Sequence, residues 1–192
     1  MKKKRKKRAR CPACKTEKYK TEMEIALAAM EALDRQQYPN YQELGMDPYR
    51  SFLNSDFSWA CDECLRTKRA IPGIPGLQQY SWNPHYAYFD TDKTCGHCGV
   101  AFVFSKEEKK YWYEDLKFWV DSEPANCTEC RRTIRQYKME NRTLSEILKK
   151  AHRDLTTPEL EKVIEIYQKW QLESKVKFYQ SILRKRIHHP PK

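Results

Sequence analysis

The apolar residues in the first third of the chain recur at helical spacing within one short segment. Residues 21–37 carry apolar side chains three and four positions apart, which predicts one helix that turns this stripe toward a core. The stripe consists of Met23, Leu27, Met30 and Leu33. Residues 38–41 read Tyr-Pro-Asn-Tyr and are expected to end the helix, because proline removes a backbone donor.

A strand and a helix are predicted in the middle of the chain. The β-prone residues 99–104 are typical of a strand that folds back as one arm of a hairpin. Ser105 and Glu108 then form a capping-box pattern, so a helix is expected over residues 106–120. We expect the aromatic side chains of this helix to pack in a small core rather than to stack on bases; they include Trp112, Tyr113, Phe118 and Trp119.

The last third of the chain is predicted to be helical. Residues 143–153 have apolar positions at helical spacing, and Thr157 followed by Pro158 is a typical helix start. Beyond Trp170 the apolar stripe moves to another side of the helix. We therefore expect a break within residues 171–174 and a helical hairpin.

Residues 71–76, Ile-Pro-Gly-Ile-Pro-Gly, form the clearest linker pattern in the chain. The segment that follows is too apolar for a free tether, and we expect it to join two modules. Its aromatic residues are Tyr80, Trp82, Tyr86, Tyr88 and Phe89.

Composition narrows the class of protein. The chain has 192 residues, of which 33% are charged, and its mean hydropathy is −0.93. No run approaches the roughly 18 apolar residues that a spanning helix needs. No apolar stretch follows the basic N-terminus, so we expect no export signal and a cytoplasmic location.

Eight cysteines carry the strongest chemical signal. All of them fall into Cys-x-x-Cys pairs: Cys11/Cys14, Cys61/Cys64, Cys95/Cys98 and Cys127/Cys130. Such a pair forms a tight knuckle that turns both sulfurs toward one metal, and two pairs complete a tetrahedral structural zinc site. Soft thiolates select zinc or iron–sulfur over magnesium or calcium. We expect two structural zinc ions, with iron–sulfur as the alternative.

An internal echo indicates how the pairs join. Cys61-Asp-Glu-Cys64 and Cys127-Thr-Glu-Cys130 share both cysteines, the glutamate between them and a following Arg-Thr, whereas the other two pairs are of a looser type. The simplest arrangement is two modules, each a knuckle followed by a pair that begins a helix. The predicted sites are then Cys11, Cys14, Cys61 and Cys64, and Cys95, Cys98, Cys127 and Cys130; crossed pairing of Cys61/Cys64 with Cys95/Cys98 stays open. At a helix start, free amide donors stabilise thiolates.

The residues around the second site resemble a known family. Residues 92–132 contain Cys-x-x-Cys, Phe-Val-Phe-Ser, Glu-x-x-x-Trp-Tyr-Glu and Cys-x-x-Cys-Arg. This combination resembles the zinc-ribbon domain of uncharacterised bacterial zinc-binding proteins, and residues 59–66 and 86–90 look like longer members of that group. The resemblance implies zinc binding by the four matched cysteines and a ribbon or treble-clef-like fold, and it implies no activity.

Charge suggests a partner. The formal net charge is +11, and eight of the positive residues lie among the first ten. A block of like charge usually acts as an interaction arm, and polyanions are its natural partners. The candidate nucleic-acid contacts are Lys2, Lys3, Lys4, Arg5, Lys6, Lys7, Arg8 and Arg10 in the arm, with Arg66, Lys68, Arg69, Arg131, Arg132 and Arg135 beside the second pairs.

Catalysis is not expected. A treble-clef nuclease of the His-Asn-His kind needs histidines between its zinc pairs, and none lies between Cys14 and Cys61 or between Cys98 and Cys127. A zinc ion held by four thiolates has no open position for a reacting water. A phosphate-binding loop pattern is also missing from the sequence.

Together these patterns predict an α+β protein. It would contain two small treble-clef or zinc-ribbon-like four-cysteine modules with short hairpins, and a C-terminal helical hairpin. The expected parts are a disordered basic arm (1–10), a first zinc module with a helical insertion (11–70), an aromatic linker (71–90), a second module (91–138) and a helical region (139–192). The expected function is a non-catalytic zinc module that contacts nucleic acid, either RNA or the ribosome. The alternative is a protein–protein adaptor that uses the C-terminal helices and residues 82–89; zinc storage or sensing ranks third because closed sites exchange slowly.

Overall fold

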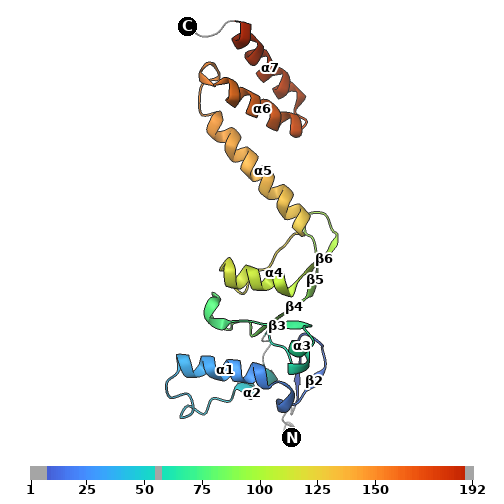
Figure 1. The fold of residues 1–192 in the computed structure, drawn as a ribbon, viewed down its shortest axis with the longest axis vertical. Helices are drawn as coiled ribbons and strands as arrows, with labels where there is room; N and C mark the ends of the chain where they lie inside the picture. The colour runs from blue at the N-terminus through green and yellow to red at the C-terminus, as the bar shows by residue number, and fades with distance from the viewer. Residues whose placement is uncertain (1–7, 55–57, 189–192) are drawn as a thin grey trace, which may run out of the picture. The chain divides into compact units, whose positions relative to one another are not determined.

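Three two-stranded antiparallel sheets and several short helices build the first part of the protein (Figure 1). The computed structural model describes residues 8–54 and 58–188. The chain divides into two units, residues 1–127 and 128–192, and each is described by itself. Among the described residues, no helix is both long and apolar enough to span a bilayer.

The first unit is made of short elements. In chain order they are β1 (Ala9–Arg10), β2 (Glu17–Lys18), η1 (Lys20–Glu22), α1 (Glu24–Gln37), α2 (Pro48–Asn54), α3 (Asp62–Arg66), β3 (Ala70–Pro72), η2 (Pro75–Leu77), β4 (Ala87–Phe89), β5 (Thr91–Thr94), β6 (Ala101–Phe104), α4 (Lys106–Lys110) and a π-helical turn, η3 (Tyr111–Asp115). The strands pair as β1–β2, β3–β4 and β5–β6.

The predicted stripe of α1 forms part of a core. Met23, Leu27 and Met30 are buried, and Leu33 is half-buried against the same cluster. Residues 20–22 form a 3-10 turn, so α1 begins at Glu24 instead of residue 21. The cause is a tertiary cap, because the Asp62 carboxylate accepts hydrogen bonds from the backbone N–H groups of Glu24 and Ile25, both at 3.1 Å.

Residues 71–90 are part of the fold and not a linker. Strand β3 pairs with β4, so that Ala70 lies opposite Phe89. Gly73 follows β3, and a Cβ atom there would lie 2.3 Å from the His85 carbonyl oxygen, so only glycine allows this close approach. Tyr86 and Tyr88 are buried, whereas Trp82 is 89% exposed. Proline and glycine are tolerated because the pairing is confined to three residues of a two-stranded ribbon.

The hairpin and the helix predicted for the second zinc module are present, but the helix ends earlier than predicted. Strand β5 pairs with β6, and the Ser105 hydroxyl accepts the Glu108 N–H at 3.1 Å to begin α4. The helical segment ends at Asp115 instead of residue 120, because Lys117 takes a left-handed conformation (φ 57°) that reverses the chain. The aromatic expectation is therefore met only in part. Tyr113 is buried and Trp112 half-buried, but Phe118 and Trp119 are exposed.

The second unit is a helical bundle. Its elements are α5 (Thr128–Ile147), a 3-10 turn η4 (His152–Asp154), α6 (Thr157–Lys169) and α7 (Glu173–His188). Helix α5 extends much further toward the N-terminus than the expected residues 143–153, because residues 131–142 are too polar to show an apolar stripe. The core of the unit comprises Leu144, Leu155, Leu160, Val163, Ile164, Ile166, Tyr167 and Tyr179.

The helical hairpin of the second unit is confirmed. Thr156, one residue before the expected Thr157, accepts the Glu159 N–H, and the Glu159 carboxylate accepts the Thr156 N–H in return, which forms a complete capping box. Gln171 adopts a left-handed conformation (φ 57°) between α6 and α7, within the break expected at residues 171–174.

The expected domain boundaries differ from the structure at two places. Ala9 and Arg10 belong to β1, and Ala9 is buried, so the arm expected over residues 1–10 does not extend past Arg8. Residues 1–7 lie outside the described residues. The boundary expected after residue 138 falls at 127/128, because α5 is one continuous helix whose second half packs with α6.

Substitution of Leu160 tests the core of the second unit. Leu160→Ala removes a fully buried side chain, and we expect it to lower the free energy of unfolding of this unit by about 2–5 kcal/mol. Hydrogen exchange of peptides from α6 and α7 in the full chain measures the effect. The control is Leu172→Ala, which changes an exposed leucine and is expected to shift stability by less than about 0.5 kcal/mol.

Candidate metal centres

The structure gathers the eight cysteines into two four-sulfur clusters. One cluster holds Cys11, Cys14, Cys61 and Cys64, the other holds Cys95, Cys98, Cys127 and Cys130, and within each the sulfurs lie within 4.8 Å of one another. The predicted pairing is confirmed, and the crossed pairing of Cys61/Cys64 with Cys95/Cys98 is wrong.

The first pair of each cluster lies at the tip of a hairpin. Cys11 and Cys14 lie between β1 and β2, and Cys95 and Cys98 lie between β5 and β6. The N–H group of the residue after each pair returns to the carbonyl of the first cysteine, with Lys15 N to Cys11 O at 2.8 Å and Gly99 N to Cys95 O at 2.9 Å.

The two knuckles also share one backbone conformation. Lys15 and Gly99 occupy the same position after their pairs, and both are left-handed, with φ of 61° and 73°. Glycine takes this conformation without strain, whereas lysine does so at a cost. The two hairpins therefore have the same backbone turn after the second cysteine, although their sequences differ.

The second pair of each cluster begins a helix. Cys61 is the N-cap residue of α3, and Cys127 directly precedes α5. A free amide at such a position can point at a thiolate, and the Cys61 N–H donates to Cys11 Sγ at 3.3 Å. The prediction that these pairs open helices is confirmed in both modules.

The sulfur spacing fits tetrahedral zinc. The distance from Cys14 Sγ to Cys61 Sγ is 3.9 Å, and that from Cys98 Sγ to Cys127 Sγ is also 3.9 Å. A tetrahedron with zinc–sulfur bonds of about 2.3 Å has edges of about 3.8 Å. Four thiolates around one point complete the coordination of zinc and leave no ligand position for water or substrate.

Hydrogen bonds favour the thiolate form at one cysteine of each cluster. Burial alone raises the pKa of Cys14, but hydrogen bonds from the Thr16 hydroxyl and N–H outweigh it and bring the pKa to about 6. Burial also raises the pKa of Cys95, and backbone N–H groups, first that of Cys98, bring it to about 6. The pKa of Cys64 is raised by burial and by the neighbouring thiols, so zinc must displace protons there.

The first cluster has a neighbour that the sequence analysis did not identify. Lys18 forms an ion pair with Glu22 at 3.1 Å, and Glu22 and then the charges of Cys61 and Cys14 raise the pKa of Lys18. Lys18 therefore places a positive charge beside this cluster. Its only sequence signal is its place on the second hairpin strand.

Asn126 lies beside the second cluster, where its Oδ1 accepts from Cys95 Sγ at 3.7 Å.

The basic residues named from the sequence lie in different places. Arg66 is exposed and pairs with Glu63 at 3.1 Å, and Lys68 and Arg69 are exposed beyond α3. Arg131, Arg132 and Arg135 lie in the N-terminal half of α5. Within the arm, Arg8 stacks on the Tyr19 ring with its guanidinium carbon 4.2 Å from the centroid, and Arg10 Nε donates to the Lys15 carbonyl at 2.9 Å. Lys2, Lys3, Lys4, Arg5, Lys6 and Lys7 lie outside the described residues.

Comparison with known proteins agrees with this geometry. Residues 89–139 match the family model described as a probable treble clef domain, which contains the whole second cluster. The resemblance found in residues 92–132 is thereby confirmed. No curated protein and no solved structure gives a significant match to the chain. The four sulfurs of each cluster and the treble-clef match identify two zinc-binding modules.

Single cysteine substitutions test the independence of the two sites. Cys14→Ser and Cys127→Ser are each expected to reduce the bound zinc from two ions per chain to one, because each change removes one ligand from one cluster. Native mass spectrometry of the purified full chain counts the ions. Loss of both ions from either variant would show that the clusters are not independent.

Zinc removal is expected to unfold the first unit and to spare the core of the second. The binding energy of a structural zinc ion is folding energy, whereas the buried core of α6 and α7 contains no cysteine. Hydrogen exchange after treatment with a chelator should show loss of protection in residues 8–127 and retained protection in residues 157–187. Retained protection around α3 and β5 would contradict this assignment.

Proposed function

We propose that the protein is a non-catalytic, zinc-stabilised module that binds RNA through one face of helix α5. The observation that carries the proposal is a stripe of basic side chains on this helix. The basic arm, Lys2 to Arg8, would add affinity that does not depend on sequence, because each neutralised phosphate releases a counterion.

The basic side chains of the stripe recur about once per turn of α5. Its members are Arg131, Arg135, Lys138 and Arg142. At 100° per residue these positions fall within about 60° of one another and extend over about 16 Å. Arg135, Lys138 and Arg142 are exposed and form no ion pair within the described part of the chain. The exposed basic side chains of Arg135, Lys138 and Arg142, aligned on one face, are suited to a row of phosphates.

The opposite face of α5 is already occupied. Leu144 is buried in the core of the second unit, and Glu140 accepts hydrogen bonds from Lys169 Nζ at 2.6 Å and from Trp170 Nε1 at 2.8 Å. Tyr137 packs on the Trp170 ring at 4.6 Å between centroids. Because packing fixes this side of the helix, the basic stripe is held toward solvent.

Charge is distributed unevenly between residues 11–127 and residues 128–192. Residues 128–192 contain 16 Lys and Arg against 8 Asp and Glu. Residues 11–127 contain 13 Lys and Arg against 18 Asp and Glu. Each zinc–tetrathiolate centre adds a formal charge of −2. The acidic zinc-binding body therefore disfavours Arg66, Lys68 and Arg69 as the main contact surface and favours α5.

The proposal that the protein is not an enzyme is supported by the metal centres. Both clusters use four thiolates for one ion, so the metal has no open position at which to activate water. Zinc in this role holds the fold together.

A protein adaptor is the second candidate, and a specific surface favours it. An apolar patch lies where η2 meets the end of the π-helical turn: Lys117 Nζ donates to the Leu77 carbonyl at 2.7 Å, and Val120 N donates to Gln79 O at 3.0 Å. Its exposed members are Leu77, Leu116, Phe118 and Trp119. Within residues 82–89, Tyr86 and Tyr88 are buried, so only exposed members such as Trp82 remain available to a partner.

Charge reversal on α5 tests the RNA proposal. Arg135→Glu combined with Lys138→Glu is expected to weaken binding of a fluorescent single-stranded RNA at least tenfold at 100 mM salt. It should also reduce the magnitude of the slope of log affinity against log salt by about 1.4, because two phosphate contacts to a single strand are lost. Fluorescence anisotropy measures both quantities, with duplex DNA as a second probe.

The matched control changes the same net charge elsewhere in the unit. Lys162→Glu combined with Lys177→Glu alters exposed residues of α6 and α7 and is expected to reduce affinity less than threefold. A chain without residues 2–7 should bind more weakly while keeping the sensitivity to Arg135 and Lys138. If the two double variants weaken binding equally, or if deletion of residues 2–7 abolishes binding, α5 is not the contact and the adaptor candidate leads.

A further inference from the structure

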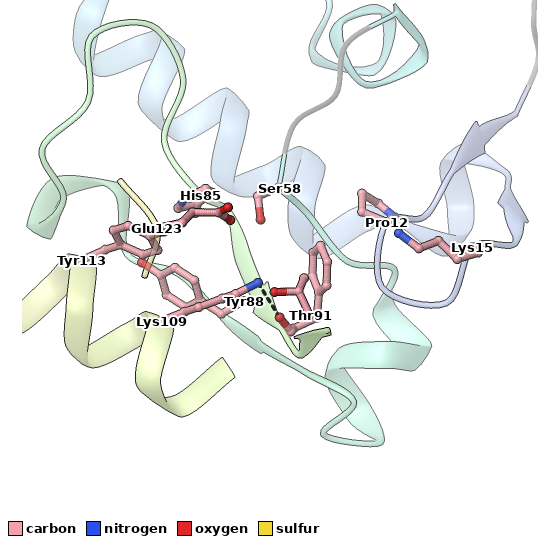
Figure 2. Close-up of a pocket in the computed structure, with 10 residues that line it drawn as sticks. Pro12, Lys15, Ser58, His85, Tyr88, Thr91, Lys109, Tyr113 and Glu123 are labelled. Atoms are coloured by element: carbon pink, nitrogen blue, oxygen red, sulfur yellow. Dashed lines mark hydrogen bonds between the residues drawn. The ribbon is translucent and has the colours of Figure 1, made fainter. Parts of the chain in front are cut away.

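A cavity of about 360 Å³ lies in the first unit between the two zinc modules. Its lining comes from the first knuckle, from the segment around Ser58 and β4, and from α4 with the chain that follows it (Figure 2). This volume is at the lower end of the range for small-molecule sites, roughly 300–1,000 Å³. None of the lining residues is a cysteine ligand or belongs to α5.

One wall of the cavity holds a buried positive charge. Lys109 is 8% exposed, and its Nζ donates to the Phe89 carbonyl at 2.8 Å. No carboxylate lies within ion-pair distance of this ammonium group in the described part of the chain, and burial lowers the pKa of Lys109 to about 8. A buried ammonium with one neutral acceptor is costly unless an anion joins it.

A second lysine approaches the cavity from the first knuckle. Lys15 Nζ lies 5.9 Å from the centroid of the Phe89 ring, and Lys109 Nζ lies 5.0 Å from the same centroid. Figure 2 shows Lys15 coming from the knuckle and Lys109 from α4. The knuckle places Lys15 there by holding a lysine in the left-handed conformation (φ 61°), where glycine would be unstrained.

The remaining polar groups of the cavity complete a donor set. The Thr91 hydroxyl is buried and lacks a hydrogen-bond partner among the residues that the structure describes. Glu123 is the carboxylate in the lining, and Lys93 neutralises it at 2.6 Å. His85 Nε2 donates to the Val120 carbonyl at 3.1 Å, and burial lowers the pKa of His85, which favours the neutral ring. The net charge facing the cavity is therefore positive.

We propose that this cavity binds the phosphoryl group of a small phosphorylated ligand, held by Lys15, Lys109 and the Thr91 hydroxyl. A phosphoryl group offers three strong acceptor oxygens, which match two ammonium groups and one hydroxyl better than the two oxygens of a carboxylate do. The binding site joins groups from both zinc modules. The inference is independent of the RNA proposal, because it uses no residue of α5.

The test uses the zinc-loaded full chain and AMP as the probe. Isothermal titration calorimetry should show saturable binding of AMP, weaker binding of inorganic phosphate, and no binding of adenosine or of acetate. Lys15→Asn is expected to weaken AMP binding at least tenfold. Asparagine tolerates the left-handed backbone, so the fold of the knuckle is kept.

Lys68→Asn is the matched control. Lys68 is also an exposed lysine in a left-handed conformation (φ 56°), it lies outside the cavity, and its substitution removes the same charge. It should leave AMP affinity within twofold of the original. Lys109→Met should abolish binding, provided that the variant still carries two zinc ions. If Lys109→Met loses zinc, the comparison of Lys15→Asn with Lys68→Asn decides the test.

The source of the phosphoryl group is settled by a second comparison. A short RNA with a 5′-phosphate and the same RNA with a 5′-hydroxyl are titrated into the Arg135→Glu, Lys138→Glu variant. Preference for the 5′-phosphate that Lys15→Asn removes identifies a nucleic-acid end as the ligand, whereas binding of AMP alone identifies a free phosphomonoester. Absence of saturable binding of every phosphorylated probe, or equal affinities of Lys15→Asn and Lys68→Asn for AMP, overturns the proposal.

Discussion

The bonds between four thiolates and one metal ion are the constraint on which the first unit depends. Apart from α1 and two three-residue 3-10 turns, its described helices have five to seven residues and its strands two to four, lengths that are not stable alone in water. Each cluster ties a hairpin tip to a helix start, and neighbouring elements then find fixed partners. Asp62 illustrates this: it follows the ligand Cys61 and caps α1 from outside. The α1 core is thus aligned by a residue that the metal site holds in place.

The sequence predicted the chemistry more fully than the extent of the elements. Ligand pairing could be inferred because the echo of Cys-x-Glu-Cys followed by Arg-Thr marks the two helix starts, and capping boxes mark α4 and α6. The extent of two elements was not predicted. Residues 71–76 look like a linker, yet they contribute β3, whose partner strand is contributed by distant residues. The N-terminal half of α5 is polar, so no apolar periodicity reveals it. The cavity between the modules depends on tertiary placement of Lys15 and Lys109 and has no sequence pattern.

The net charge of residues 11–127 differs in sign from that of the second unit. Residues 11–127 are acidic before metal is counted and remain so after it, whereas residues 128–192 are basic. Lys109 is buried, and no carboxylate of the described residues lies within ion-pair distance of its ammonium group. Natural proteins retain such groups at a cost in stability, and an anion bound in the cavity next to Lys109 would offset that cost.

The two modules differ in the length of chain that each metal ion closes into a ring. Cys14 and Cys61 are 47 residues apart, while Cys98 and Cys127 are 29 apart; α1 and α2 fill the longer ring. The entropy of ring closure grows only with the logarithm of length, so the extra residues cost about 0.4 kcal/mol. Adding helices to the chain between the two ligand pairs therefore costs little free energy of ring closure. At this position the architecture can gain new surface without loss of metal affinity.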